Sequence, residues 1–179
     1  RGSGGDVPTN FDRDFQGTVT VRRALQLSLN IPAIKLLDAI GPARLVARMR
    51  RAGVRPQLPD LSPPGLAIGL GGVGVTLTDL VRLYAAIARG GTAVDLRETS
   101  RIRAGTLGQP LASSGAPVLD ERAAWSVASI LAGAPAPVHA LSGNLAFKTG
   151  TSYGYRDAWA IGFDGRHVIG VWTGRADGA

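Results

Sequence analysis

The sequence contains no cysteine, which excludes disulfide bonds, thiol catalysis and cysteine-ligated zinc. It has only two histidines, His139 and His167, and neither has a carboxylate at ligand spacing, so we expect no metal site. No run of 18 apolar residues occurs, and we expect no membrane-spanning segment. Lysine is scarce as well, because Lys35 and Lys148 are the only two among 20 basic residues.

The net charge of +7 raises the question of a nucleic-acid partner. The one dense run of arginines, between Arg44 and Arg55, has no interleaved aromatic residues and is more typical of a solvated helix face. We therefore expect no nucleic-acid partner. The positive balance also favours an anionic partner such as a membrane surface or an acidic polymer.

The length of 179 residues suits one domain with its own core. The sequence begins with R-G-S-G-G rather than Met, which is typical of a cut end or a linker. Residues 1–17 are expected to be an irregular entry segment or linker. We expect the chain to be a piece of a longer protein.

Five helices are expected before residue 133 from capping residues and apolar periodicity. They cover residues 21–29 after Thr20, 32–40 from Pro32, 42–52, 79–88 after Thr76 or Thr78, and 121–132 after Asp120.

Three short apolar runs follow from about residue 144, at 145–152, 158–163 and 167–174. The last two are joined by Asp164-Gly165-Arg166, and an Asp-Gly connection between β-rich runs indicates a hairpin. Helices followed by antiparallel strands predict an α+β fold.

A glycine-rich segment, Gly69 to Gly74, matches the G-x-G-x-x-G pattern of dinucleotide-binding loops, and Asp95 follows 21 residues later. That fold needs the glycines to open a helix, whereas Thr76 and Thr78 lie beyond the last glycine. No alternation of strands and helices follows. The pattern favours close packing or a tight turn, with nucleotide binding as the alternative.

Two further motifs carry the chemistry of the sequence. Ser28-Leu29-Asn30 lies where the first expected helix gives way to the second, and Lys148-Thr149-Gly150-Thr151 lies on the first expected strand. Singly, each has a plain explanation, since Asn30 suits a helix cap and one lysine can occur anywhere. Together, in this order and these contexts, they indicate a serine acyl-transfer site.

Acyl transfer without histidine needs a proton relay, an amide for the substrate peptide, a cation for its carboxylate and backbone donors for the oxyanion. The two motifs contain all of these groups. The candidates are Ser28 for the relay, Asn30 for the amide, Lys148 for the cation, Thr149 and Thr151 for hydroxyls, and Gly150 for close backbone approach.

At these residues the chain resembles the penicillin-binding transpeptidase and serine β-lactamase superfamily, whose motifs are S-x-x-K, S-x-N and K-T-G. S-L-N-I-P-A-I-K-L-L and the glycine-rich stretch with its following helix resemble class A, bifunctional penicillin-binding proteins. The runs 147–163 and 168–178 are most similar to one branch of that class. The resemblance covers nearly all of residues 6–179, and it implies that 18–179 are the C-terminal part of a transpeptidase domain.

The resemblance implies a serine-type D,D-transpeptidase that cross-links peptidoglycan stem peptides, uses no cofactor and is trapped by β-lactams. It implies that Ser28 belongs to the proton relay and that Asn30 binds the substrate amide. Lys148 and Thr149 would bind the terminal carboxylate and tune the relay. The strand backbone at Thr151 would pair with the substrate and donate to the oxyanion. It also implies an extracytoplasmic location, at the periplasmic face of the inner membrane, through an N-terminal anchor of the parent protein.

One part of the family pattern is missing. An S-x-x-K motif would need serine three residues before a lysine, and those positions hold Pro32 and Leu145. We therefore expect the chain alone to be inactive and to form no acyl-enzyme. A non-catalytic module that binds cell-wall peptide or a partner protein is the alternative. The choice between transpeptidase and D,D-carboxypeptidase stays open, whereas a β-lactamase is disfavoured because no E-x-x-x-N motif occurs.

Overall fold

The computed structural model describes residues 17–58, 63–96, 115–137, 145–152 and 156–175. His139 and most of the expected entry segment lie outside these ranges. The described helices are α1 (Val21–Gln26), α2 (Asn30–Ile40), α3 (Pro42–Arg51), the 3-10 helix η2 (Leu66–Leu70), α4 (Leu77–Ala88) and α5 (Glu121–Ala132). The strands are β1 (Ala146–Thr151), β2 (Asp157–Phe163) and β3 (Val168–Gly174).

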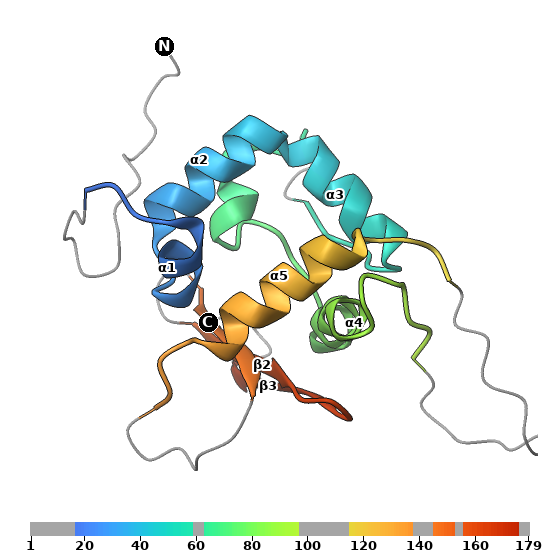
Figure 1. The fold of residues 1–179 in the computed structure, drawn as a ribbon. Coiled ribbons are helices and arrows are strands. Elements are labelled where there is room, and N and C mark those ends of the chain that lie inside the picture. The colour runs from blue at the N-terminus through green and yellow to red at the C-terminus, as the bar shows by residue number, and fades with distance from the viewer. Residues whose placement is uncertain (1–16, 59–62, 97–114, 138–144, 153–155, 176–179) are drawn as a thin grey trace, which may run out of the picture.

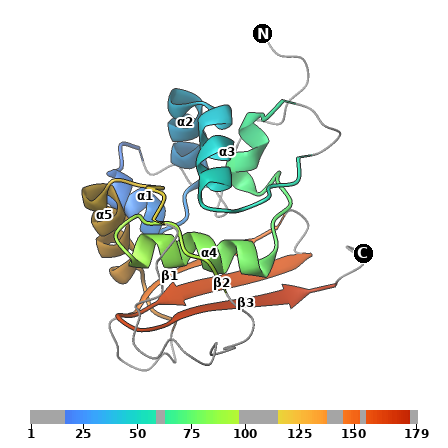
Figure 2. The same ribbon diagram turned by 90° about the vertical axis from the view of Figure 1, so that its right-hand side faces the viewer.

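The three strands form one antiparallel sheet in the order β1-β2-β3. Its register pairs Lys148 with Ile161 and Trp159 with Trp172. Helix α4 lies along β2 and β3, while α5 lies against β1 (Figure 2). Helices α2 and α3 form a further group beyond α4, with α1 beside α5 (Figures 1 and 2). The α+β fold expected from the sequence is confirmed.

Side-chain caps fix where three helices begin, as the sequence predicts. Thr20 Oγ1 accepts a hydrogen bond from Arg23 N at the start of α1, and Asp120 Oδ1 accepts one from Ala123 N at the start of α5. Thr76 and Asp79 form a reciprocal capping box at the start of α4. Each cap satisfies a backbone N–H that has no partner within its own helix.

The first helix is shorter than expected. It ends at Gln26 instead of residue 29, and α2 begins at Asn30 rather than at Pro32. Pro32 lies within the first turn of α2, where a missing backbone N–H costs nothing. The helix boundary moves upstream because Ser28 adopts a left-handed conformation with a φ of 56°.

The turn between β2 and β3 is built around Asp164 rather than around a glycine with positive φ. Asp164 Oδ1 accepts hydrogen bonds from the backbone N–H groups of Arg166 and His167, both at 2.6 Å. These bonds lower the pKa of the Asp164 carboxyl to about 2. His167 belongs to this turn and not to the strand in which the sequence had placed it, and its ring lies 3.4 Å from the Asp164 carboxylate.

The glycine-rich segment is a site of close packing. It follows the 3-10 helix η2, and α4 begins only at Leu77, so the glycines do not open a helix after a strand. A Cβ on Gly72 would lie 2.8 Å from the Ala67 backbone, and one on Gly69 would lie 2.9 Å from Leu37 Cδ2. The Ala67 backbone therefore leaves room only for glycine at position 72, whereas a side chain at position 69 would displace the end of the Leu37 side chain.

Three buried clusters hold the layers together. One joins α3 to α4 and the residues before α5, and includes Val54 and Ala86. A second joins α2, α3 and η2 around Leu37, Val46 and Ile68. The third joins α5 to the sheet through Leu131, Ala146 and Phe163, with Leu25 of α1 and Tyr84 of α4 at its margin. Burial raises the pKa of Tyr84 to about 12.

Candidate active site

Ser28 occupies the residue just after the C-cap of α1. Its backbone N–H donates to Leu25 O at 3.2 Å, and the next N–H, of Leu29, reaches back to Ala24 O at 2.9 Å. This pair of bonds is a Schellman motif, with Ser28 at the position where glycine is usual and Leu29 buried after it. The motif ends α1 and turns the chain sharply into α2.

Ser28 is the only non-glycine residue with positive φ within the described part of the chain. A serine in this left-handed region is strained by about 1 kcal/mol relative to glycine, because its Cβ crowds the backbone. Such strain persists where the surrounding structure imposes it, and it concentrates at functional sites. The strained turn leaves Ser28 exposed and directs its hydroxyl toward β1.

Lys148 reaches Ser28 from β1. Its register partner on β2, Ile161, is buried under the helices, and so is Ala146 two residues earlier in β1. Because side chains two apart share a face, Lys148 also projects from the helix-covered face of the sheet. Its side chain is half-buried there and extends toward the α1–α2 junction.

Lys148 Nζ donates hydrogen bonds to Ser28 Oγ and to its neighbour's carbonyl, Thr149 O, the latter at 2.8 Å. Burial lowers the pKa of the Lys148 ammonium, because removal from water disfavours the charged form. Among the described residues no carboxylate pairs with this ammonium. The site therefore combines a hydroxyl with an amine that releases its proton more readily than an exposed lysine.

The other predicted site residues lie near this pair in different orientations. Asn30 is half-buried and is the first residue of α2, so Leu29 rather than Asn30 is the N-cap. Thr149 and Thr151 are exposed and alternate to the face of β1 opposite Lys148. Gly150 lies on the Lys148 face, where a Cβ would meet Trp159 Cβ only at 4.0 Å.

A set of contacts at the end of β1 was not foreseen from the sequence. Ser152 N donates to Asp157 O at 3.0 Å, and Asp157 N donates back to Ser152 Oγ at 2.9 Å. The Asp157 carboxylate accepts from Trp172 Nε1 at 2.9 Å. These bonds tie the end of the K-T-G-T segment to β2 and β3. The only signal in the sequence is that Ser152 and Asp157 border the two strands.

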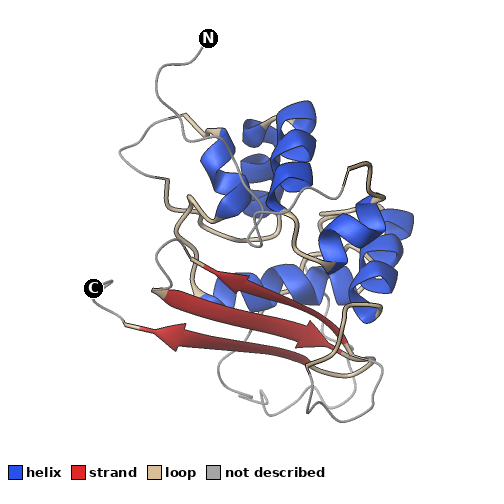
Figure 3. Cartoon of the chain, turned by 90° about the vertical axis from the view of Figure 1, so that its left-hand side faces the viewer, coloured by secondary structure: helices blue, strands red, loops and turns tan. Residues whose placement is uncertain are grey.

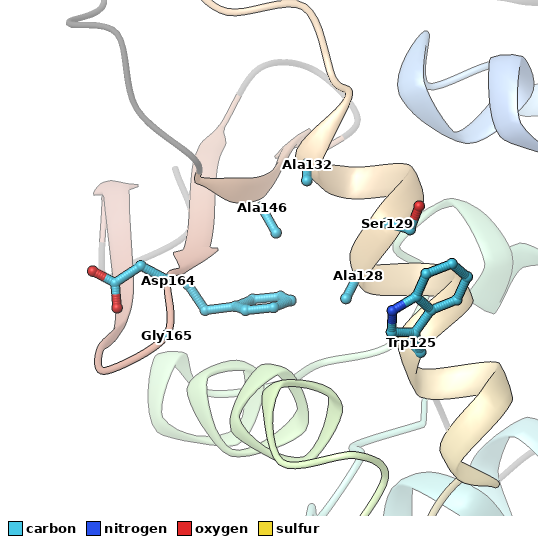
Figure 4. A pocket seen from close by; sticks show the side chains of 8 residues that line it. Trp125, Ala128, Ser129, Ala132, Ala146, Asp164 and Gly165 are labelled. Carbon is cyan, nitrogen blue, oxygen red and sulfur yellow. The ribbon is translucent and has the colours of Figure 1, made fainter.

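The described hollows in the surface lie apart from this pair. One, with a volume of about 240 Å³, lies between α5 and the start of β1; Ala128 and Ala146 point into it, and the Asp164 carboxylate points away (Figure 4). Within the described residues no group of three or more His, Cys, Asp or Glu could hold a metal ion. No helix in that part of the chain is long and apolar enough to cross a membrane.

The family model described as "Penicillin binding protein transpeptidase domain" matches residues 3–176. Penicillin-binding protein 1C of Escherichia coli is 46% identical over 182 residues, which cover 99% of this chain and 22% of that protein. Penicillin-binding protein 1B of Vibrio cholerae is 30% identical, over 99% of this chain and 24% of its own length. The chain thus spans less than a quarter of each of these relatives.

Solved structures share the fold. Penicillin-binding protein 1A from Haemophilus influenzae matches 99% of this chain and 33% of its own with a TM-score of 0.77 at 19% identity. Penicillin-binding protein A from M. tuberculosis, solved as an imipenem acyl-enzyme complex, matches 95% of this chain and 45% of its own with a TM-score of 0.70 at 21% identity. The resemblance expected from the sequence is confirmed, and the branch suggested by the two C-terminal runs is that of penicillin-binding protein 1C.

Proposed function

The chain belongs to the penicillin-binding protein transpeptidase domain family, and from this premise we propose that it forms one wall of a D,D-transpeptidase active site acting on peptidoglycan stem peptides. The contact between Lys148 Nζ and Ser28 Oγ carries the proposal. It joins the S-x-N and K-T-G-T motifs across 120 residues of sequence, on elements that otherwise belong to different layers.

In this proposal Lys148 and Ser28 form the relay that delivers a proton to the leaving D-Ala amine. The lowered pKa of Lys148 favours such a transfer, because a proton relay works best when its pKa approaches the working pH. While still protonated, the same ammonium attracts the terminal carboxylate of the stem peptide. Asn30, at the first turn of α2, binds the substrate's amide.

The edge of β1 is the proposed binding surface for the peptide backbone. Within the described residues β1 pairs only with β2, so its other edge is open to an added strand. Lys148 projects to one face of this strand, whereas Thr149 and Thr151 project to the other. A substrate that contacts all three must lie along the edge. There the Thr151 backbone N–H can donate to the oxyanion, because successive N–H groups of a strand point to opposite edges and the next one, Ser152 N, already donates to Asp157 O of β2.

The chain contains no S-x-x-K motif, and we propose that the nucleophile comes from a segment outside this sequence. The relatives' greater length is compatible with this arrangement, as is an extracytoplasmic site of action. On this proposal β-lactams acylate the complete protein and not this chain alone.

The test places this chain in the corresponding segment of Escherichia coli penicillin-binding protein 1C and measures acylation by a fluorescent penicillin. We expect the chimera to be labelled. Lys148→Ala should slow acylation by about 100-fold, a typical loss for one preorganised electrostatic group. Lys35→Ala is the matched control, since Lys35 is the other lysine and is exposed on α2.

A folded chimera that takes up no penicillin would refute the proposed function. Equal rates of labelling in the Lys148→Ala and Lys35→Ala chimeras would show that Lys148 does not contribute to acylation. In a parallel arm the chain alone is incubated with penicillin and weighed by intact mass spectrometry. We expect no covalent adduct, and a single adduct would show that the chain holds its own nucleophile.

A further inference from the structure

The geometry points to Gln26 as a positioning residue for the Ser28–Lys148 pair. We propose that a hydrogen bond from its side chain anchors α1 to the end of α5 and thereby holds Ser28 against Lys148. The inference deepens the proposed function and rests on it for its catalytic meaning. The contacts on which it depends, however, all lie within this chain and exist whether or not the chain takes part in catalysis.

Helix α1 is too short to be stable without contacts to the rest of the chain. It has six residues, fewer than an isolated helix needs for stability, so its place depends on tertiary contacts. Ser28 follows its last residue by two, and any shift of α1 displaces the Ser28 hydroxyl. The question is which contacts fix α1 relative to β1.

Helix α5 supplies the contacts on the α1 side. Gln26 Nε2 donates to Ile130 O at 2.8 Å, and Arg22 Nη1 donates to Ser129 O at 3.2 Å. Both acceptors lie in the last turn of α5, where carbonyl groups lack the usual partner four residues on; Ile130 O also accepts the N–H of the C-cap Gly133, at 3.2 Å. The arginine also suits the negative end of the α5 dipole. The Gln26 bond is the shorter of the two and is partly buried, whereas the Arg22 bond is exposed.

The same end of α5 also holds β1. Leu131 is 2% exposed and packs with Ala146 of β1 and Phe163 of β2. Ala146 precedes Lys148 by two residues, just as Gln26 precedes Ser28 by two. The last turn of α5 therefore holds both halves of the pair at once, one through hydrogen bonds and the other through apolar packing.

The Gln26 amide occupies space that is free only because residue 133 is a glycine. A Cβ on Gly133 would lie 2.6 Å from Gln26 Nε2. The φ of Gly133 is −96°, which any residue adopts, so an alanine there would strain no backbone and would act only by displacing the amide. Gly133→Ala thus tests the hydrogen bond without altering α1 or the site.

The experiment uses the scarcity of lysine. A sample labelled with ¹³C at lysine Cε has two lysine signals, Lys35 and Lys148, and a pH titration by NMR gives the pKa of each. Gln26→Leu and Gly133→Ala should both raise the pKa of Lys148, because the loosened α1 admits water to the ammonium. The signal of Lys35, which is exposed on α2, serves as an internal reference. Gln57→Leu, the same change at an exposed glutamine, should leave both signals as they are.

A pKa of Lys148 that stays unchanged in both folded variants overturns the proposal, even if their melting temperatures fall. Gly133→Ala keeps the test valid should Gln26→Leu fail to fold. The titration requires no substrate and no penicillin. It can therefore support the role of Gln26 even if the chimera experiment refutes the proposed function, and it can refute that role even if the chimera is labelled. In the chimera, Gln26→Leu should slow acylation by about tenfold or more, the penalty expected for a small misplacement of a reacting group.

Discussion

Ser28 is a residue of the proposed site whose backbone conformation is unfavourable for the stability of the fold. The Schellman turn that ends α1 requires a left-handed residue, for which glycine is favoured. Serine accepts the strain and supplies a hydroxyl beside Lys148. On the proposed function, stability and catalysis therefore make opposite demands at this position.

Comparing Ser28→Gly with Ser28→Ala isolates that strain, because both variants lose the hydroxyl. We expect the glycine variant to be more stable than the alanine variant by about 1 kcal/mol, as only alanine keeps a Cβ in the left-handed region. Urea unfolding monitored by circular dichroism measures the difference. An alanine variant as stable as the glycine variant would show that Ser28 is unstrained.

The residues of the candidate site were proposed from the sequence, but the contact between Ser28 and Lys148 could not be derived from it. Ser28 and Lys148 are 120 positions apart, and no periodicity or capping rule brings two such positions together. The resemblance to a known family supplied the pairing. Gln26 was missed because a glutamine on a short helix has no distinguishing signal until α5 is seen to lie against it.

At the scale of elements, three helix caps were predicted correctly, whereas the end of α1 and the start of α2 were not. Thr20, Thr76 and Asp120 cap helices through side-chain bonds that depend on local sequence alone. The end of α1 depends on a left-handed serine, which local preference disfavours. The antiparallel sheet was predictable because its strands are short, consecutive and separated by turn residues.

The packing of α4 on the sheet depends on a glycine in β3. A Cβ on Gly170 would lie 2.7 Å from Val81 Cγ2 and 2.9 Å from Leu77 Cδ1, both on α4. We expect Gly170→Ala to lower the free energy of unfolding by about 1–3 kcal/mol through overpacking. Gly150→Ala is the control, because its nearest contact would be an ordinary 4.0 Å. Chemical denaturation measures the free energy of unfolding of both variants, and we expect that of Gly170→Ala to be the lower. Equal values would mean that α4 does not pack closely against β3 at Gly170.

At the scale of the whole molecule, the described helices that contact the sheet all lie on one face (Figure 3). The opposite face carries Ile169 and Val171 of β3, with exposed fractions of 62% and 53%. Neighbouring aliphatic side chains left in water on a sheet favour association, since burial against another surface removes them from solvent. These two side chains are exposed because the described helices that contact the sheet all pack on its other face.

We therefore expect the chain to bind the dye ANS and to form species larger than a monomer at high protein concentration. The double variant Ile169→Thr/Val171→Thr should reduce both, because threonine keeps the β-branched shape that strands favour and adds a hydroxyl to the exposed face. Val21→Thr is the matched control, a valine exposed to 65% on α1, away from the sheet. Light scattering coupled to size-exclusion chromatography reads the mass directly. If the unmodified chain and the double variant are both monomeric and bind ANS equally, these two residues do not form an associating surface.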